Sequence, residues 1–158
     1  MEYTLINNTK VSSLFVKEDY FPIIIRFSTE ELNNHFLEFN YGETDMFELS
    51  VHPNTKKIKQ FTLTLCNHYV FKDDLINVPP FNECDLLISG PNKIECSMFT
   101  TIVYNNGVKI ETSKDAASKH IKCGQLIFSF TSSDELTAIY IIDLSSDEIQ
   151  HVKSELLV

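Results

Sequence analysis

The chain has 158 residues, of which 43% are hydrophobic and 22% charged. These proportions are typical of one globular domain spanning residues 1–158, and they exclude a disordered chain. The 22 acidic residues outnumber the 13 basic ones and give a net charge of −9, which repels nucleic acid and anionic membranes and attracts cationic partners, so we expect neither nucleic acid nor a membrane as a ligand.

The N-terminus does not combine a basic start with an apolar run, so the sequence predicts no signal peptide. The longest apolar run extends from Phe21 to Ile25 and ends at Arg26, far short of the ~20 residues that span a bilayer. Four cysteines stand at irregular spacings, which favours reduced thiols in a chain without a secretion signal. We therefore expect a cytoplasmic protein.

Short strands are predicted in the N-terminal third, where β-branched and aromatic residues cluster at residues 3–6, 14–16, 23–27 and 36–39. Between the last two, Ser28 and Glu31 have the spacing of a helix capping box. The residues that follow, Leu32 and two asparagines, support no more than one or two helical turns.

The middle of the chain contains a long predicted hairpin. Hydrophobic residues alternate with polar ones along residues 46–51 and again along residues 57–71. A turn at residues 52–55, which includes Pro53 and Asn54, separates the two arms. Residues 73–84 contain two adjacent prolines and are predicted to form a long loop within the same domain.

Two further hairpins follow. One joins residues 94–104 to residues 108–112 across Asn105, Asn106 and Gly107, and the Asn-Gly pair is typical of a type I′ turn. The other joins residues 125–131 to residues 136–144 across a polar four-residue turn.

A C-terminal helix is predicted over residues 146–157. Ser145 and Glu148 form a capping box, and Ile149, Val152 and Leu156 then define one apolar stripe. The fold class expected from all these elements is α+β. We expect a predominantly antiparallel β-sheet, curled or barrel-like, with the C-terminal α-helix packed on it.

The sequence contains no strong catalytic or metal-binding signature, so we expect no enzyme, cofactor or metal. No Gly-x-Ser-x-Gly elbow or phosphate-binding loop is present. Cys66 and His68 are two residues apart and would share one face of a strand. Together with His120 and Cys123 they are a possible zinc set, although the spacing matches no standard zinc motif. Buried cysteines and surface histidines explain the same residues.

One stretch suggests a family. The strand from Phe47 to Val51, the turn from His52 to Thr55 and the strand up to Leu65 resemble a hairpin of small bacterial immunity proteins. These belong to contact-dependent growth inhibition and other polymorphic toxin systems. The resemblance implies a protein that binds and neutralises a cognate toxin domain, with a nuclease as the expected class, by covering its active site or a nearby surface.

Acids in predicted loops are the candidate contacts with such a basic partner. They are Glu43, Asp45, Asp73, Asp74, Glu83, Asp85, Asp134 and Glu135. Tyr41, Tyr69 and Phe81 are nearby aromatic residues that would serve as anchors. Each acid is equally consistent with an ordinary solvated charge. The alternative functions are a small-molecule-binding β-barrel and an assembly subunit without catalysis.

Overall fold

The computed structural model describes residues 1–6, 10–28 and 34–157. Strands dominate these ranges, and their single helix is C-terminal, which confirms the predicted mostly β fold with a C-terminal helix. The short helix expected after Ser28 lies outside the described residues.

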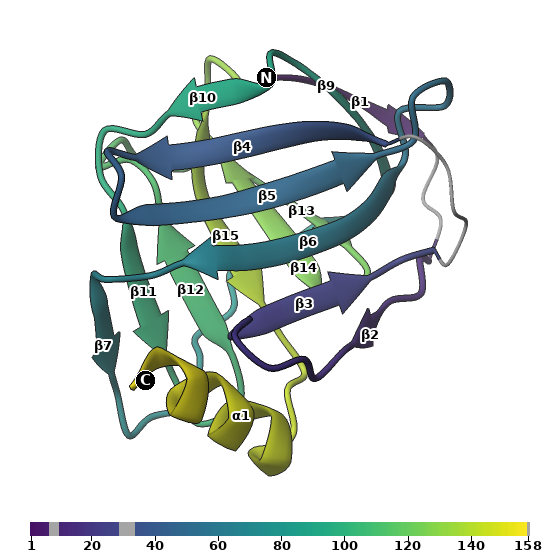
Figure 1. Ribbon diagram of the computed structural model, residues 1–158. Coiled ribbons are helices and arrows are strands. Elements are labelled where there is room, and N and C mark those ends of the chain that lie inside the picture. Colours follow the sequence, from purple (N-terminus) through teal and green to yellow (C-terminus); the bar gives the residue numbers. More distant parts are fainter. Residues whose placement is uncertain (7–9, 29–33, 158) are drawn as a thin grey trace.

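Two large sheets face each other, and a short third sheet lies across one end of the pair (Figure 1). In spatial order, the six-stranded sheet contains β10 (Lys93–Glu95), β4 (His35–Tyr41), β5 (Asp45–Val51), β6 (Ile58–Leu65), β3 (Ile23–Arg26) and β2 (Leu14–Phe15). The seven-stranded sheet contains β7 (Tyr69–Phe71), β11 (Thr100–Val103), β12 (Val108–Glu111), β15 (Leu136–Ile141), β14 (Leu126–Phe130), β13 (Lys119–Cys123) and β8 (Asn82–Glu83). The third sheet pairs β1 (Glu2–Ile6) with β9 (Asp85–Ser89).

The main core fills the space between the two large sheets, because each turns an apolar face inward. Phe47, Leu49 and Phe61 on β5 and β6 are completely buried. The rings of Phe39 and Phe47 stack with centroids 4.6 Å apart, and Phe128 reaches the same core from the opposite sheet. The period-2 alternation that predicted the strands therefore follows from the burial of one face of each sheet.

The three predicted hairpins are confirmed as β5–β6, β11–β12 and β14–β15, each antiparallel. The expected single, mainly antiparallel, curled or barrel-like sheet is wrong. The described residues form three sheets, and two of these include parallel pairs, β4 with β10, β7 with β11 and β8 with β13. Each parallel pair uses a strand of two or three residues at a sheet edge, whose partner is not encoded by local hydrophobic alternation.

Two predicted hairpin arms are also too long. Residues 57–71 divide into β6 in one large sheet and β7 in the other, and residues 94–104 divide into β10 and β11 in the same way. The chain therefore crosses between the sheets at both places. Because consecutive strands here belong to different sheets, the fold is a two-layer sandwich and not a single closed barrel.

The β11–β12 turn is not of type I′, because neither Asn106 nor Gly107 has a positive φ. The loop before β8 holds this turn instead, since Asn106 Oδ1 accepts from the Ile76 N–H at 2.8 Å. Ile76 packs with Ile127 and Tyr140 on the outer face of the seven-stranded sheet. Glycine is required at position 107 because the chain passes close to β15, and an added Cβ would lie 2.8 Å from the Ile141 carbonyl oxygen.

Helix α1 (Ser146–Leu156) lies at the opposite end of the sandwich from β1 and β9 (Figure 1). The predicted capping box is present at Ser145 and Glu148. Ile149, Val152 and Leu156 are buried against the core, as their spacing predicted.

Asp45 fixes the corner where the chain passes from β6 to β7. Asp45 is buried, with 1% of the residue exposed. Oδ1 accepts from the main-chain N–H groups of Asn67 and His68 at 2.8 and 3.0 Å, and Oδ2 accepts from Thr44 Oγ1 at 2.7 Å and His68 Nδ1 at 2.6 Å. Burial by itself raises the pKa of Asp45, but the hydrogen bonds from His68, Thr44 and Asn67 together outweigh it and lower the pKa.

We expect Asp45→Asn to lower the free energy of unfolding by about 1–3 kcal/mol at neutral pH, because the amide cannot accept all four bonds. Because the pKa of Asp45 is lower in the folded state than in the unfolded state, its ionised carboxylate stabilises the fold at pH values above the ordinary aspartate pKa. This contribution is lost as pH falls through the folded-state pKa. Urea unfolding at pH 7 and below pH 4 should therefore show the difference from the wild type shrinking in acid. Glu43→Gln, in the neighbouring exposed turn, is the control, and an equal loss in both variants would contradict the role of Asp45.

Candidate functional site

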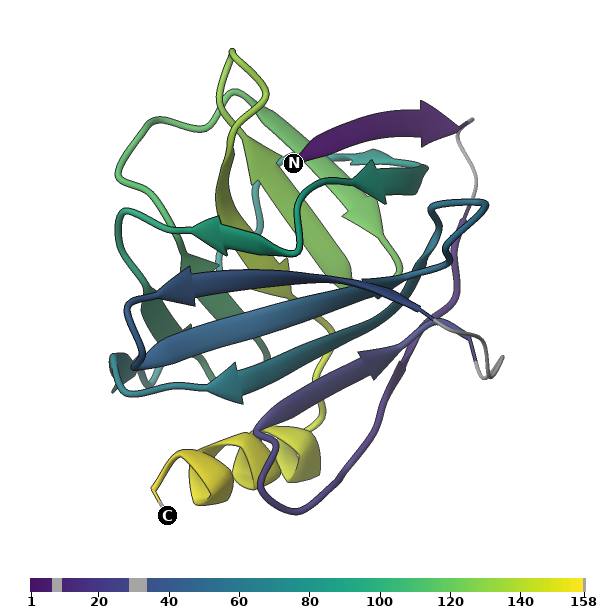
Figure 2. The same ribbon diagram turned by 45° about the horizontal axis from the view of Figure 1, so that its top comes forward.

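Strand β1 lies across one end of the sandwich and pairs antiparallel with β9 (Figure 2). Within the described ranges, β9 is its sole strand partner. The other side of β9 is attached to the β5–β6 turn, since the Ile88 N–H donates to the Lys56 carbonyl at 2.9 Å. One edge of β1 therefore faces outward.

The register of the hydrogen bonds on the two sides of β9 determines which main-chain groups β1 directs to its outer edge. Because the Ile88 N–H points to Lys56, the main-chain groups of Ile88 point away from Tyr3, the residue opposite it. Main-chain groups alternate in direction along a strand, so Thr4 bonds to β9. Tyr3 and Leu5 consequently direct their N–H and C=O groups to the outer edge.

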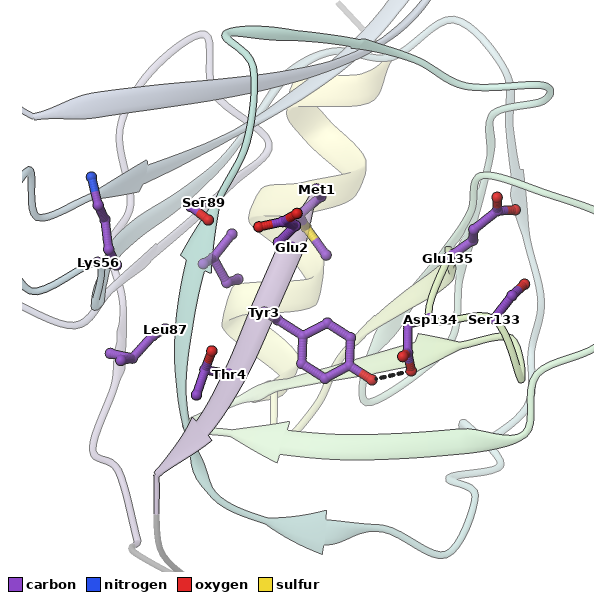
Figure 3. Close-up of a pocket in the computed structure, with 11 residues that line it drawn as sticks. Met1, Glu2, Tyr3, Thr4, Lys56, Leu87, Ser89, Ser133, Asp134 and Glu135 are labelled. Carbon is purple, nitrogen blue, oxygen red and sulfur yellow. Dashed lines mark hydrogen bonds between the residues drawn. The ribbon is translucent and has the colours of Figure 1, made fainter.

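Two hollows flank β1. The larger, about 650 Å³, follows its N-terminal half between residues 87–89 of β9 and residues 133–135 of the β14–β15 turn (Figure 3). The second, about 550 Å³, lies beside the outer edge and is lined by Tyr3, Leu5, residues 80–82, residues 118–121 and Asp134. We call this second hollow the β1 groove.

Tyr3 and Asp134 line both hollows, so the contact between these two side chains lies where the hollows meet. The Tyr3 hydroxyl donates to Asp134 Oδ1 at 2.7 Å (Figure 3), and Lys119 Nζ donates to the same oxygen at 2.5 Å. The Tyr3 ring stacks on Phe130 with centroids 4.1 Å apart. Burial and the bond to Asp134 raise the pKa of Tyr3, and the bonds from Lys119 and Tyr3 lower the pKa of Asp134. The hydroxyl is thus a neutral donor to an ionised carboxylate at neutral pH.

Of the eight predicted contact acids, Asp134 lines the β1 groove, and three others lie close to its lining along the chain or across the β1–β9 pair. Asp134 and Glu135 are exposed in the β14–β15 turn. Glu83 and Asp85 are half-buried, and Asp85 pairs with Ile6 of β1. Three of these acids form ion pairs: Glu83 with Lys122 at 3.2 Å, Asp85 with Lys57 at 3.5 Å and Asp134 with Lys119 at 2.5 Å.

The other four predicted acids are not part of this site. Glu43 is exposed in the β4–β5 turn, and Asp73 and Asp74 are exposed in the loop after β7. Asp73 Oδ1 accepts from Asn105 Nδ2 at 3.0 Å. Asp45 is not a surface contact, because it is buried and its oxygens are occupied by the β6–β7 corner.

The groove also exposes apolar surface. Leu5 is 46% exposed on β1, and Phe81, one of the predicted anchors, is 42% exposed on the facing loop. The other two predicted anchors lie elsewhere, with Tyr41 at the end of β4 and Tyr69 at the start of β7. Of the predicted contacts, Phe81 and Asp134 therefore line the same groove, and Glu83, Asp85 and Glu135 lie close to it.

The possible Cys–His and zinc chemistry is not supported by the geometry. His68 bonds to Asp45, and His120 Nδ1 bonds to Ser129 Oγ at 2.7 Å. Burial raises the pKa of both Cys66 and Cys123 to about 11, which makes each a poor nucleophile at neutral pH. Across the part of the chain that the structure describes, no three His, Cys, Asp or Glu side chains converge as metal ligands.

Sequence reasoning missed Tyr3 and Lys119. Their contact with Asp134 joins positions 131 and 15 residues apart, and no local pattern relates them. The prediction of a strand at residues 3–6 was the one available signal.

A comparison of the sequence with protein-family models and with curated proteins finds no match. In the described ranges, no helix has the length and apolar character required to cross a membrane.

The phase of the β1–β9 ribbon predicts an alternating pattern of amide hydrogen exchange. The amides of Tyr3 and Leu5 should exchange quickly, and those of Thr4 and Ile6 should be protected because they bond to β9. Exchange of the ¹⁵N-labelled protein, followed by NMR, measures each amide. Protection of Tyr3 and Leu5 in the free protein would contradict an open edge.

Proposed function

We propose that this chain binds and neutralises a basic protein, in the manner of an immunity protein that covers a cognate toxin domain. One observation supports this proposal: Asp134 lines a groove that also exposes Leu5 and Phe81, and Glu135, Glu83 and Asp85 lie close to its lining. Acids attract and orient a cationic partner, whereas apolar side chains that lose water on binding retain it. A nuclease is the expected class of toxin, because a nuclease holds phosphates with cationic side chains.

The lysines of the site moderate this attraction. Glu83, Asp85 and Asp134 already have cationic partners on the chain, so their charges are partly compensated. Glu135 has no ion-pair partner among the described residues and is exposed, so its charge is fully available to a partner. The net charge of −9 disfavours nucleic acid as a competing ligand. We place the encounter in the cytoplasm, where an immunity protein meets an incoming toxin.

Affinity purification of the tagged chain from its native host, followed by mass spectrometry, tests this function. We expect stoichiometric recovery of a basic protein domain, in a complex that weakens as salt is raised because the attraction is electrostatic. Recovery of the chain alone, or only as its own oligomer, would contradict the proposal and favour the assembly subunit.

A matched pair of variants tests the location of the contact. Glu135→Lys and Glu43→Lys change the net charge equally, but only Glu135 lies beside the β1 groove, because it follows Asp134, which lines the groove, and itself lines the neighbouring hollow. We expect Glu135→Lys to weaken partner binding roughly tenfold, mainly through the association rate, and Glu43→Lys to have little effect. Surface plasmon resonance against the recovered partner measures both rates, and equal effects would show that only the overall charge matters.

A further inference from the structure

We propose that the partner contributes an extended segment that lies in the β1 groove and pairs with the outer edge of β1 as an added strand. This inference rests on the proposed function and deepens it, because it specifies the partner segment. The segment is a strand in which basic and apolar residues alternate.

The main chain of β1 supplies the pairing groups. Tyr3 and Leu5 direct their N–H and C=O groups away from β9, and the same two residues line the groove. Residues two apart on a strand lie about 7 Å from each other, which is the spacing at which alternate residues of an antiparallel partner bond. An added strand would therefore satisfy all four groups, as in other cases of recognition by strand addition.

The side chains of the groove provide a place for an apolar residue. Tyr3 and Leu5 point to the same face of β1, and Tyr3 is fixed there by its contacts with Phe130 and Asp134. Leu5 and Phe81 are both exposed in the groove, and the buried Ile121 forms part of its lining. An apolar side chain of the added strand that packs between Leu5 and Phe81 would remove both from water.

The charges at the groove select a basic segment. Asp134 lines the groove and is followed by Glu135. Glu83 follows the lining residue Asn82, and Asp85 pairs with Ile6 at the far end of β1, so basic residues at the ends of an added strand would meet acids. A second copy of this chain is a poor occupant, because two molecules of charge −9 repel each other.

Strand β7 is another edge with exposed apolar residues, Val70 and Phe71. It is less suited to a basic segment. Lys153 Nζ lies 5.6 Å from the centroid of the Phe71 ring, and Lys72 directly follows the strand. The β1 groove also has lysines, since Lys119 lines it and Lys122 Nζ lies 5.8 Å from the centroid of the Phe81 ring, but these two pair with Asp134 and Glu83. Neither Lys72 nor Lys153 forms an ion pair with a described residue, and uncompensated cations at an edge oppose pairing with a cationic strand.

The probe for the test is a capped peptide of sequence Lys-Val-Lys-Val-Lys-Val-Lys, with Glu-Val-Glu-Val-Glu-Val-Glu as its charge control. Titration into the ¹⁵N-labelled protein should produce saturable shifts at the amides of Tyr3, Leu5 and Phe81. It should also slow the hydrogen exchange of Tyr3 and Leu5. The acidic peptide should produce neither effect.

Two variants separate main-chain pairing from side-chain contact. Leu5→Pro removes the outward N–H, and proline is tolerated at such an edge position because no bond to β9 is lost. Leu5→Ala removes the side chain but keeps the N–H. We expect Leu5→Pro to bind the basic peptide about tenfold more weakly than Leu5→Ala does, the usual effect of one lost hydrogen bond.

Equal affinities of the two variants, shifts confined to β7, or no saturable binding at millimolar peptide would overturn strand addition. None of these results would affect recovery of a basic partner from the host, which tests the proposed function separately. If the exchange of Tyr3 and Leu5 slows with the peptide but no basic partner is recovered, the edge site stands and the proposed function fails. The exchange measurement uses the wild type, so it remains decisive if Leu5→Pro does not fold.

Discussion

The buried carboxylate of Asp45 is the constraint on which the two-sheet arrangement depends. Between β6 and β7 the chain leaves one large sheet for the other, and a change of sheet leaves main-chain N–H groups without ladder partners. Asp45 accepts two of these N–H groups, from Asn67 and His68, and its ionised form is favoured by them. A single acid thereby couples the β4–β5 turn to the first strand of the opposite sheet.

The opposite end of the sandwich depends on a contact of a different kind. Strand β1 does not pair with any described strand close to it in the sequence. Its position is fixed by pairing with β9 and by Tyr3, which contacts Phe130 and Asp134. These contacts hold one wall of the β1 groove against β13 and the β14–β15 turn. A groove whose walls are fixed before binding loses little conformational entropy when it is filled.

The two ends also use their acids differently. At the β6–β7 corner the acid is desolvated and its oxygens are fully used by the fold, so it contributes to stability. Around the β1 groove the acids are exposed or half-buried and three are balanced by lysines, so they contribute little to stability and more to the field that a partner encounters. Charge steers the encounter there, whereas the strand edge and apolar side chains would determine how long the complex lasts.

The amino-acid sequence by itself determined the hairpins, the capped helix and the acidic surface, because alternation, turn residues, capping boxes and net charge are local or additive properties. It did not determine the sheet order or the parallel edge pairs, nor the separate roles of Glu43 and Asp45, which are two residues apart in one predicted loop. Only the tertiary structure decided that one is exposed and the other buried, since Asp45 meets its donors 22 and 23 residues later. The β1 groove likewise required residues 3, 81, 119 and 134 to meet. Contacts over such separations depend on how the sheets pack, and no periodicity along the chain records them.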